Sequence, residues 1–181
     1  HAHATAGINQ AIIAGARSIE HGTYLDDESI RLMIEHGTYY VPTIYVGDYY
    51  AGTDKLLAQE KNDDVYLLYR DEWLRRIGSA HKQGVKIVVG VDLGGYAIDP
   101  QVYAREFAAL VEAGLSPMEA IRAGTSVAAE MLRWDDQVGS IKEGKLADII
   151  AVSGNPLNDI STLEKPLFVM LGGKIIRRPE S

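Results

Sequence analysis

The stretch that decides the fold is His1-Ala2-His3-Ala4 together with Ser18-Ile19-Glu20-His21-Gly22, separated by one helix-length segment. Within that segment, apolar residues recur near helical spacing at Ile8, Ala11, Ile12 and Ala16. Gly15 lies where such a helix would end. The pattern predicts a strand end, a helix and a second strand, with histidine at both strand ends. In a barrel of parallel strands these ends converge. Neutral imidazoles that converge suit a divalent metal ion.

Further along the chain, helices are predicted both from the capping residues at their ends and from the spacing of their apolar residues. The first has Asp26 or Asp27 as its N-cap and Gly37 at its C-terminal end. Four more are predicted, at residues 65–84, at residues 101–114, after the capping box Ser116-Pro117-Met118-Glu119 and after Thr125-Ser126. His36 and His81 lie near helix C-terminal ends, where cations are favoured, so we interpret both as structural.

Residues 85–92 give the clearest strand prediction, a nearly continuous apolar run that ends in Asp92. A carboxylate there needs a partner, for which a metal ion or an imidazolium is the obvious choice. The alternative is an aspartate that caps a turn. Residues 38–46 are β-branched and aromatic and predict another strand, although Pro42 argues against a central position. The polar residues 47–64 predict a long loop.

The C-terminal part of the chain has a different character. Residues 138–152 predict two strands joined by a turn at Glu143-Gly144. Residues 168–177 predict a hairpin that turns at Gly172-Gly173. Short strands and glycine turns therefore replace the helix–strand alternation of the N-terminal part.

Together these motifs resemble the metal-dependent amidohydrolase superfamily, most closely its prolidase-like and imidazolonepropionase-like branch. The resemblance is carried by His1-Ala2-His3-Ala4, Ile19-Glu20-His21-Gly22, Val89-Gly90-Val91-Asp92-Leu93-Gly94-Gly95 and the run from Gly139-Ser140-Ile141 to Gly144-Lys145-Leu146-Ala147-Asp148. It implies an α/β fold: residues 1–135 would form the C-terminal half of a TIM-like (β/α)8 barrel, strands five to eight. Residues 136–181 would form part of a small β-sandwich.

The resemblance also implies a site. His1 and His21 would be metal ligands, and Asp92 both a metal ligand and the catalytic base. The cofactor would be a divalent metal, Zn²⁺ by preference, with one or two ions in the complete site. Substrate-binding positions would be His3, Thr43 and Tyr45, for each of which a packing or supporting role is the alternative. His1-Ala2-His3 alone also fits the His-x-His pair of strand one, but the short gap to His21 favours strand five.

The implied activity is hydrolysis of an amide (C–N) bond by metal-activated water, with a dipeptide, an N-acyl amino acid or a cyclic amide as the small-molecule substrate. The superfamily's strand-one His-x-His pair and its strand-four lysine are missing from this sequence. We therefore expect a partner, either a complementary N-terminal half or a second subunit. The alternative is a catalytically inactive half-barrel fragment or assembly module.

Composition and net charge limit the other classes of partner that we expect. The 181 residues are 46% hydrophobic, which is ordinary for a globular protein, and carry a net charge of −7. No basic patch is present to neutralise phosphate, so we expect no binding to nucleic acid or to an anionic membrane surface. No apolar run is long enough to span a membrane. The lack of cysteine excludes disulfides and thiolate chemistry and is consistent with the cytoplasmic location that we expect.

Overall fold

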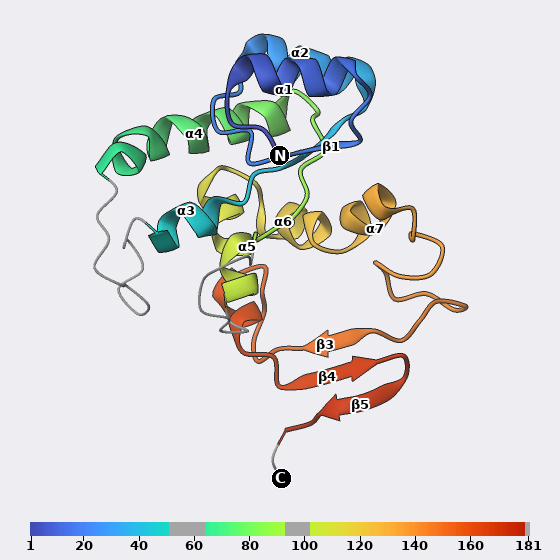
Figure 1. The fold of residues 1–181 in the computed structure, drawn as a ribbon. Helices are drawn as coiled ribbons and strands as arrows, with labels where there is room; N and C mark the ends of the chain where they lie inside the picture. The colour runs from blue at the N-terminus through green and yellow to red at the C-terminus, as the bar shows by residue number, and fades with distance from the viewer. Residues whose placement is uncertain (51–63, 93–101, 180–181) are drawn as a thin grey trace.

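The computed structural model describes residues 1–50, 64–92 and 102–179 (Figure 1). Its α-helices are α1 (Thr5–Ile13), α2 (Asp27–His36), α3 (Ile44–Tyr50), α4 (Asp64–Lys82), α5 (Val102–Glu112), α6 (Pro117–Ala123) and α7 (Ser126–Leu132). Its strands are β1 (Ser18–Glu20), β2 (Tyr39–Val41), β3 (Ile149–Ala151), β4 (Phe168–Leu171) and β5 (Lys174–Arg177), with a 3₁₀ helix η1 at Ile160–Glu164. The chain is an α/β fold, as predicted.

A parallel ladder lies at the centre of the helical part. β1 pairs with β2, with Ile19 opposite Tyr40. Isolated parallel bridges extend the ladder on both sides, from Ala2 to His21 and from Tyr40 to Ile87. The order across the ladder is therefore Ala2, β1, β2, Ile87. Because all of these segments run parallel, their carboxyl ends meet at the same edge.

The strand predicted for residues 38–46 is realised only as β2. Pro42 has no N–H to donate to a ladder, and Thr43 adopts a left-handed φ of 55°, so the chain leaves the ladder there. α3 follows at once and occupies the start of the loop predicted for residues 47–64. The remainder of that loop, residues 51–63, lies outside the described residues.

The strand predicted for residues 85–92 joins the ladder only around Ile87. There the Tyr40 N–H donates to the Lys86 carbonyl at 3.0 Å, and the Val88 N–H donates to the Tyr40 carbonyl at 2.9 Å. The segment is nevertheless buried as predicted, at Val85, Ile87, Val88 and Val91. Within the described residues the only ladder bridge of this segment is at Ile87, so the predicted strand is realised as an isolated bridge and not as a continuous strand.

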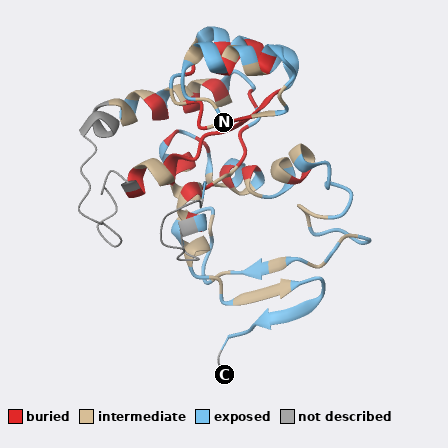
Figure 2. Ribbon diagram, in the orientation of Figure 1, coloured by how far each residue is buried: buried red, intermediate tan, exposed pale blue. Residues whose placement is uncertain are grey.

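The main core lies between this ladder and the helices that follow its strands. Tyr40 is fully buried at its centre. The side chains that pack in the same core come from the six helices α1 to α6, among them Ile8, Ile12, Ile30, Met33, Ile44, Trp73, Ile77, Leu110, Ala120 and Ala123. Figure 2 shows that the buried positions gather where the helices meet the central strands, while the C-terminal sheet is largely exposed.

The opposite face of the central strands is covered by α7. The buried residues there are Tyr39, Val41 and Val88, against which Val127, Ala128 and Met131 pack. Arg17 fastens the helix by donating from Nε to the Met131 carbonyl at 2.5 Å and from Nη2 to the Glu130 carbonyl at 2.9 Å. Lys86 adds an ion pair to the Glu130 carboxylate at 2.5 Å. α7 is thus held against the start of the ladder by cations from two of its strand segments.

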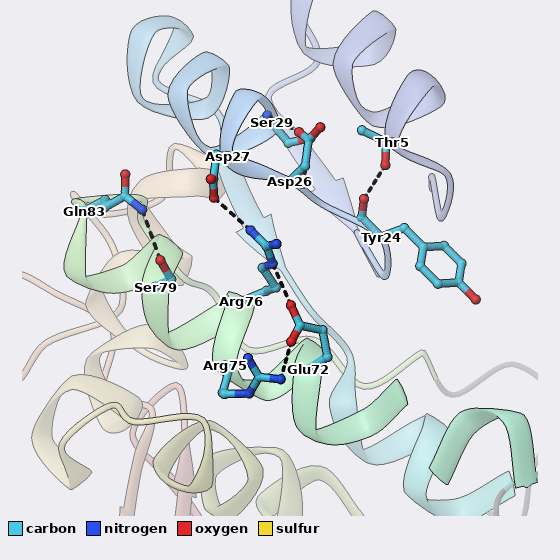
Figure 3. A network of polar contacts seen from close by, with 10 residues as sticks. All are labelled: Thr5, Tyr24, Asp26, Asp27, Ser29, Glu72, Arg75, Arg76, Ser79 and Gln83. Atoms are coloured by element: carbon cyan, nitrogen blue, oxygen red, sulfur yellow. Dashed lines mark hydrogen bonds and ion pairs between the residues drawn. The ribbon is translucent and has the colours of Figure 1, made fainter. Parts of the chain in front are cut away.

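Local end signals explain where the helices begin and end. Asp26 and Ser29 form a capping box at the start of α2, which ends at Gly37 with a left-handed φ of 66°. Arg76 of α4 then joins α2 by an ion pair to Asp27 at 2.8 Å (Figure 3). The predicted capping box at the start of α6 and the predicted helix starting at Ser126 are also confirmed. Such exposed pairs contribute little stability singly, so the apolar core carries the fold.

The C-terminal segment forms an antiparallel sheet in the order β3-β4-β5. The predicted hairpin at Gly172-Gly173 is confirmed by the pairing of β4 with β5. The first strand predicted within residues 138–152 is absent from the described structure, and turns replace it. Lys145 accounts for this, because its Nζ donates to the Val138 carbonyl at 3.0 Å and to Ser140 Oγ at 2.8 Å, which folds the segment back on itself. None of the described helices is long and apolar enough to cross a membrane.

α3 starts against a buried carboxylate that comes from α5. Glu106 is fully buried, and its Oε1 and Oε2 accept the N–H groups of Ile44 at 2.9 Å and Tyr45 at 2.8 Å. Burial raises the pKa of Glu106 to about 8, while the two N–H donors act in the opposite direction. The two oxygens of this carboxyl group supply partners for the free N–H groups that any helix N-terminus exposes.

We expect this carboxyl group to make the stability of the fold fall as pH rises. Its pKa is 4.5 in the unfolded chain and about 8 in the fold, so the unfolded chain releases the proton first. The free energy of unfolding of the wild type, relative to Glu106→Gln, should therefore decrease on the order of a few kcal/mol between these two pH values. Urea denaturation at a series of pH values measures it. Glu112→Gln is the matched control, because Arg70 lowers the pKa of Glu112 and its contribution is flat over that range. A flat difference for Glu106→Gln would contradict the assignment.

Candidate metal centre

Two imidazoles meet at the carboxyl edge of the ladder. His1 precedes the Ala2 bridge and His21 follows β1, so two adjacent parallel segments bring them together. His1 Nδ1 lies 3.0 Å from His21 Nε2, and the ring centroids are 5.0 Å apart. The His1 side chain is exposed, whereas His21 is 9% exposed. The juxtaposition that the sequence predicted for this pair is present.

The backbone of His21 is held by a chain of buried hydrogen bonds. His21 has a left-handed φ of 68°, which is uncommon for a residue other than glycine. Tyr40 Oη donates to the His21 carbonyl at 2.9 Å and lies 3.2 Å from the Gly22 carbonyl. Trp73 Nε1 donates in turn to Tyr40 Oη at 3.0 Å. A Cβ at Gly22 would lie 2.5 Å from the Tyr40 ring, so the turn also requires glycine.

His3 lies against the same imidazole. Its ring stacks on that of His21 with centroids 4.6 Å apart and an interplanar angle of 6°. Its Nδ1 lies 2.9 Å from Thr23 Oγ1, which fixes the ring orientation. His3 is exposed, so one edge of the stacked pair faces solvent. Its role in substrate binding stays a prediction.

The electrostatic surroundings favour a neutral His21. Burial lowers the pKa of His21, the nearby His3 lowers it further, and the carboxylate of Asp92 partly offsets both. An imidazole must be neutral to offer a ring nitrogen to a metal ion. The site therefore keeps His21 in the form that such a ligand needs.

Asp92 lies at the end of the segment that follows Ile87, and it is exposed with a left-handed φ of 46°. It follows the Ile87 bridge at the carboxyl end of its segment, and its negative charge acts to raise the pKa of His21. Thr43 is closer still, with Oγ1 2.8 Å from His21 Nδ1. Three successive segment ends, at His21, Thr43 and Asp92, therefore carry left-handed residues other than glycine. Such outliers cluster at functional sites.

Tyr45 contacts Arg105 of α5. It belongs to α3 and is buried, and Arg105 Nη1 donates to its hydroxyl at 3.0 Å. The Arg105 guanidinium also lies 5.5 Å from the centroid of the Tyr45 ring. These contacts connect Tyr45 to α5, and its predicted contact with substrate stays a prediction.

The chemistry of the donor set fits part of a metal site. Two nitrogen ligands at ~2.1 Å from one tetrahedral ion lie about 3.4 Å apart. The 3.0 Å between His1 Nδ1 and His21 Nε2 is close to this separation. Among the described residues, however, no three or more His, Cys, Asp or Glu side chains form a group that could hold a metal ion. The residues present thus fit two ligands of a site that needs others.

Sequence reasoning missed the residues that support His21. Tyr40 was part of an apolar and aromatic run that predicted only a strand, and nothing in the pattern indicated a hydroxyl aimed at the His21 carbonyl. Thr43 was predicted to line a substrate pocket. That prediction rested on the resemblance of Val41-Pro42-Thr43 to the end of strand seven in the family, and it did not indicate the contact of Thr43 Oγ1 with His21 Nδ1.

The model of the amidohydrolase family matches residues 1–176. The chain belongs to the amidohydrolase family. This confirms the predicted superfamily, whose members are hydrolases, and the prolidase-like branch is confirmed by the solved structures that resemble the chain.

Among curated amidohydrolase relatives, the ochratoxinase of Aspergillus niger is 36% identical over 186 residues, which cover 99% of this chain and 38% of the relative. A crystal structure of a Xaa-Pro dipeptidase with methionine in its active site is 41% identical, with a TM-score of 0.85 over 98% of this chain and 44% of that one. A prolidase complexed with N-methylphosphonate-L-proline is 30% identical, with a TM-score of 0.82 over 98% and 44%. The chain spans about two-fifths of the length of the curated ochratoxinase that it matches.

Proposed function

We propose that these residues belong to a metal-dependent hydrolase of amide (C–N) bonds. The observation that carries the proposal is the approach of His1 Nδ1 to His21 Nε2 at the carboxyl edge of a parallel ladder, beside the charge of Asp92. The expected cofactor is one or two divalent ions, Zn²⁺ by preference. A divalent ion bound there would acidify a water molecule and polarise the scissile carbonyl.

His1, His21 and Asp92 have distinct roles in this proposal. His1 and His21 offer ring nitrogens Nδ1 and Nε2 as ligands. The carboxylate of Asp92 would lie beside a bound metal ion, where it would accept a proton from the attacking water and return it to the leaving amine nitrogen. Its exposed position leaves it accessible to both.

We propose a dipeptide, an N-acyl amino acid or a cyclic amide as the substrate. The names of the relatives support this range, since a Xaa-Pro dipeptidase, a prolidase and an ochratoxinase all resemble the chain. His3 at the same edge and Tyr45 on α3 are the proposed substrate contacts, while the hydroxyl of Thr43, the third position predicted for this role, is occupied by His21 Nδ1 and the Pro42 carbonyl. Fold alone does not choose among these substrates.

We further propose that residues 1–135 form strands five to eight of an eight-stranded barrel and residues 136–181 part of a β-sandwich. No described strand extends the ladder beyond Ala2 on one side or Ile87 on the other. An open sheet edge of this kind needs a partner. The partner would be a complementary N-terminal half or a second subunit that supplies a His-x-His strand and a lysine strand. We call the chain with this partner the completed protein.

The test is reconstitution. The 181-residue chain is mixed with a polypeptide that carries the His-x-His strand and the lysine strand, and metal content and hydrolysis of Xaa-Pro dipeptides and N-acyl amino acids are measured. We expect metal binding and hydrolysis to appear together in the mixture, while the separate chain stays inactive and self-associates. A catalytically competent monomer of the separate chain would overturn the half-barrel proposal. A completed protein that folds but binds no metal and hydrolyses no amide would favour the inactive assembly module instead.

A further inference from the structure

The hydroxyl of Thr43 touches two groups at the end of β2. Its Oγ1 lies 2.8 Å from His21 Nδ1 and donates to the Pro42 carbonyl at 2.6 Å. Thr43 is 3% exposed, and His21 beside it is buried as well. Solvent is therefore excluded from this contact, and the two protein groups must satisfy each other.

The number of available hydrogens determines which atom is the donor in the contact between Thr43 Oγ1 and His21 Nδ1. A threonine hydroxyl has one hydrogen, and a carbonyl oxygen can only accept. Because the Thr43 hydrogen goes to the Pro42 carbonyl, the hydrogen of the second contact must come from His21 Nδ1. A neutral imidazole carries one N–H, so His21 Nε2 then has a free lone pair.

We infer that Thr43 is a positioning residue that fixes His21 in the tautomer protonated on Nδ1 and leaves Nε2 free to bind a cation. The inference rests on the proposed function, which makes Nε2 a metal ligand. Metal-bound histidines generally donate their second ring N–H to a protein oxygen, and such partners set both tautomer and ring orientation. Thr43 is placed to be that oxygen, from the segment end next to His21.

The tautomer of His21 also determines where His1 carries its ring proton. If His21 Nε2 carries a lone pair, the 3.0 Å contact needs its hydrogen from His1 Nδ1 in the metal-free protein. That proton must leave Nδ1 before both nitrogens can bind one cation, and a neutral imidazole can carry it on Nε2 instead. Binding of a cation is therefore expected to move the His1 proton from Nδ1 to Nε2, with no net release, while the His21 tautomer stays unchanged.

The test is nitrogen NMR of ¹⁵N-histidine-labelled completed protein without metal, with Zn²⁺ affinity measured separately by chelator competition. The wild type should show a protonated Nδ1 and an unprotonated Nε2 at His21. Thr43→Val, which keeps the shape and removes the hydroxyl, should shift the proton toward Nε2 and weaken Zn²⁺ binding roughly 10–100-fold. Thr43→Ser should restore both. The matched control is Thr23→Val, which removes the partner of His3 and should leave the His21 tautomer unchanged.

Two results would overturn the inference: a wild-type His21 protonated on Nε2, or a Thr43→Val variant with the wild-type tautomer and wild-type Zn²⁺ affinity. The wild-type spectrum alone decides the tautomer if Thr43→Val does not fold. Failure of the proposed function looks different, because the completed protein would then bind no Zn²⁺ and hydrolyse no amide while the Nδ1-protonated signal of His21 remains.

Discussion

Replacing His21 with alanine is expected to abolish metal binding and hydrolysis together in the completed protein. His21 is the imidazole on which the site converges: His1 meets its Nε2 at 3.0 Å, His3 stacks on its ring, and Thr43 lies at its Nδ1. Removing a metal ligand should cost more than the roughly 10–100-fold loss of affinity typical of a group that only supports one. Metal content by mass spectrometry and the rate of amide hydrolysis measure the two effects.

His36→Ala and His81→Ala are the matched controls. His36 is the exposed last residue of α2. His81, near the end of α4, has its Nε2 3.1 Å from a carboxylate oxygen of Glu119. Neither contacts the imidazole cluster in the described structure. Both variants should retain metal and activity. Equal loss of metal from His36→Ala would remove the basis for assigning His21 as a ligand.

Features that depend on neighbouring residues could be predicted from the sequence. The capping boxes at Asp26 and Ser116, the glycine that ends α2 and the hairpin at Gly172-Gly173 all rest on contacts within a few residues. The meeting of His1 and His21 was predictable for a related reason. One helix-length segment between two parallel strands places both strand ends at the same edge.

Features that depend on distant residues could not be predicted. The β-branched and aromatic residues from Ile44 onward favoured a strand, but Glu106, far along the chain on α5, accepts the first N–H groups of α3 and stabilises a helix. The hydrogen bonds from Tyr40 to the His21 carbonyl and from Trp73 to Tyr40 likewise join separate elements. In residues 85–92 the propensity for a strand is clear, but in the part of the chain that the structure describes the segment pairs only through the bridge of Ile87 to Tyr40.

The same edge gives the largest expected effect on turnover, at Asp92. Asp92→Asn keeps the size of the side chain and removes its basicity. Asn tolerates the left-handed φ of 46° as well as Asp does, so the fold should survive. If the Asp92 carboxylate accepts the proton of the attacking water, the turnover number should fall by roughly 10²–10⁴. Most bound metal should remain, since His1 and His21 are untouched.

A second readout separates this role from a structural one. The charge of Asp92 raises the pKa of His21, so removing it should lower the pKa of His21 further in the metal-free protein, as measured by NMR titration. Asp136→Asn, at an exposed position after α7, is the matched control and should change neither quantity. If Asp92→Asn lowers the His21 pKa yet keeps near-normal turnover, Asp92 lies at the site as a charge and the proton passes through another group. If neither changes, Asp92 only terminates its segment.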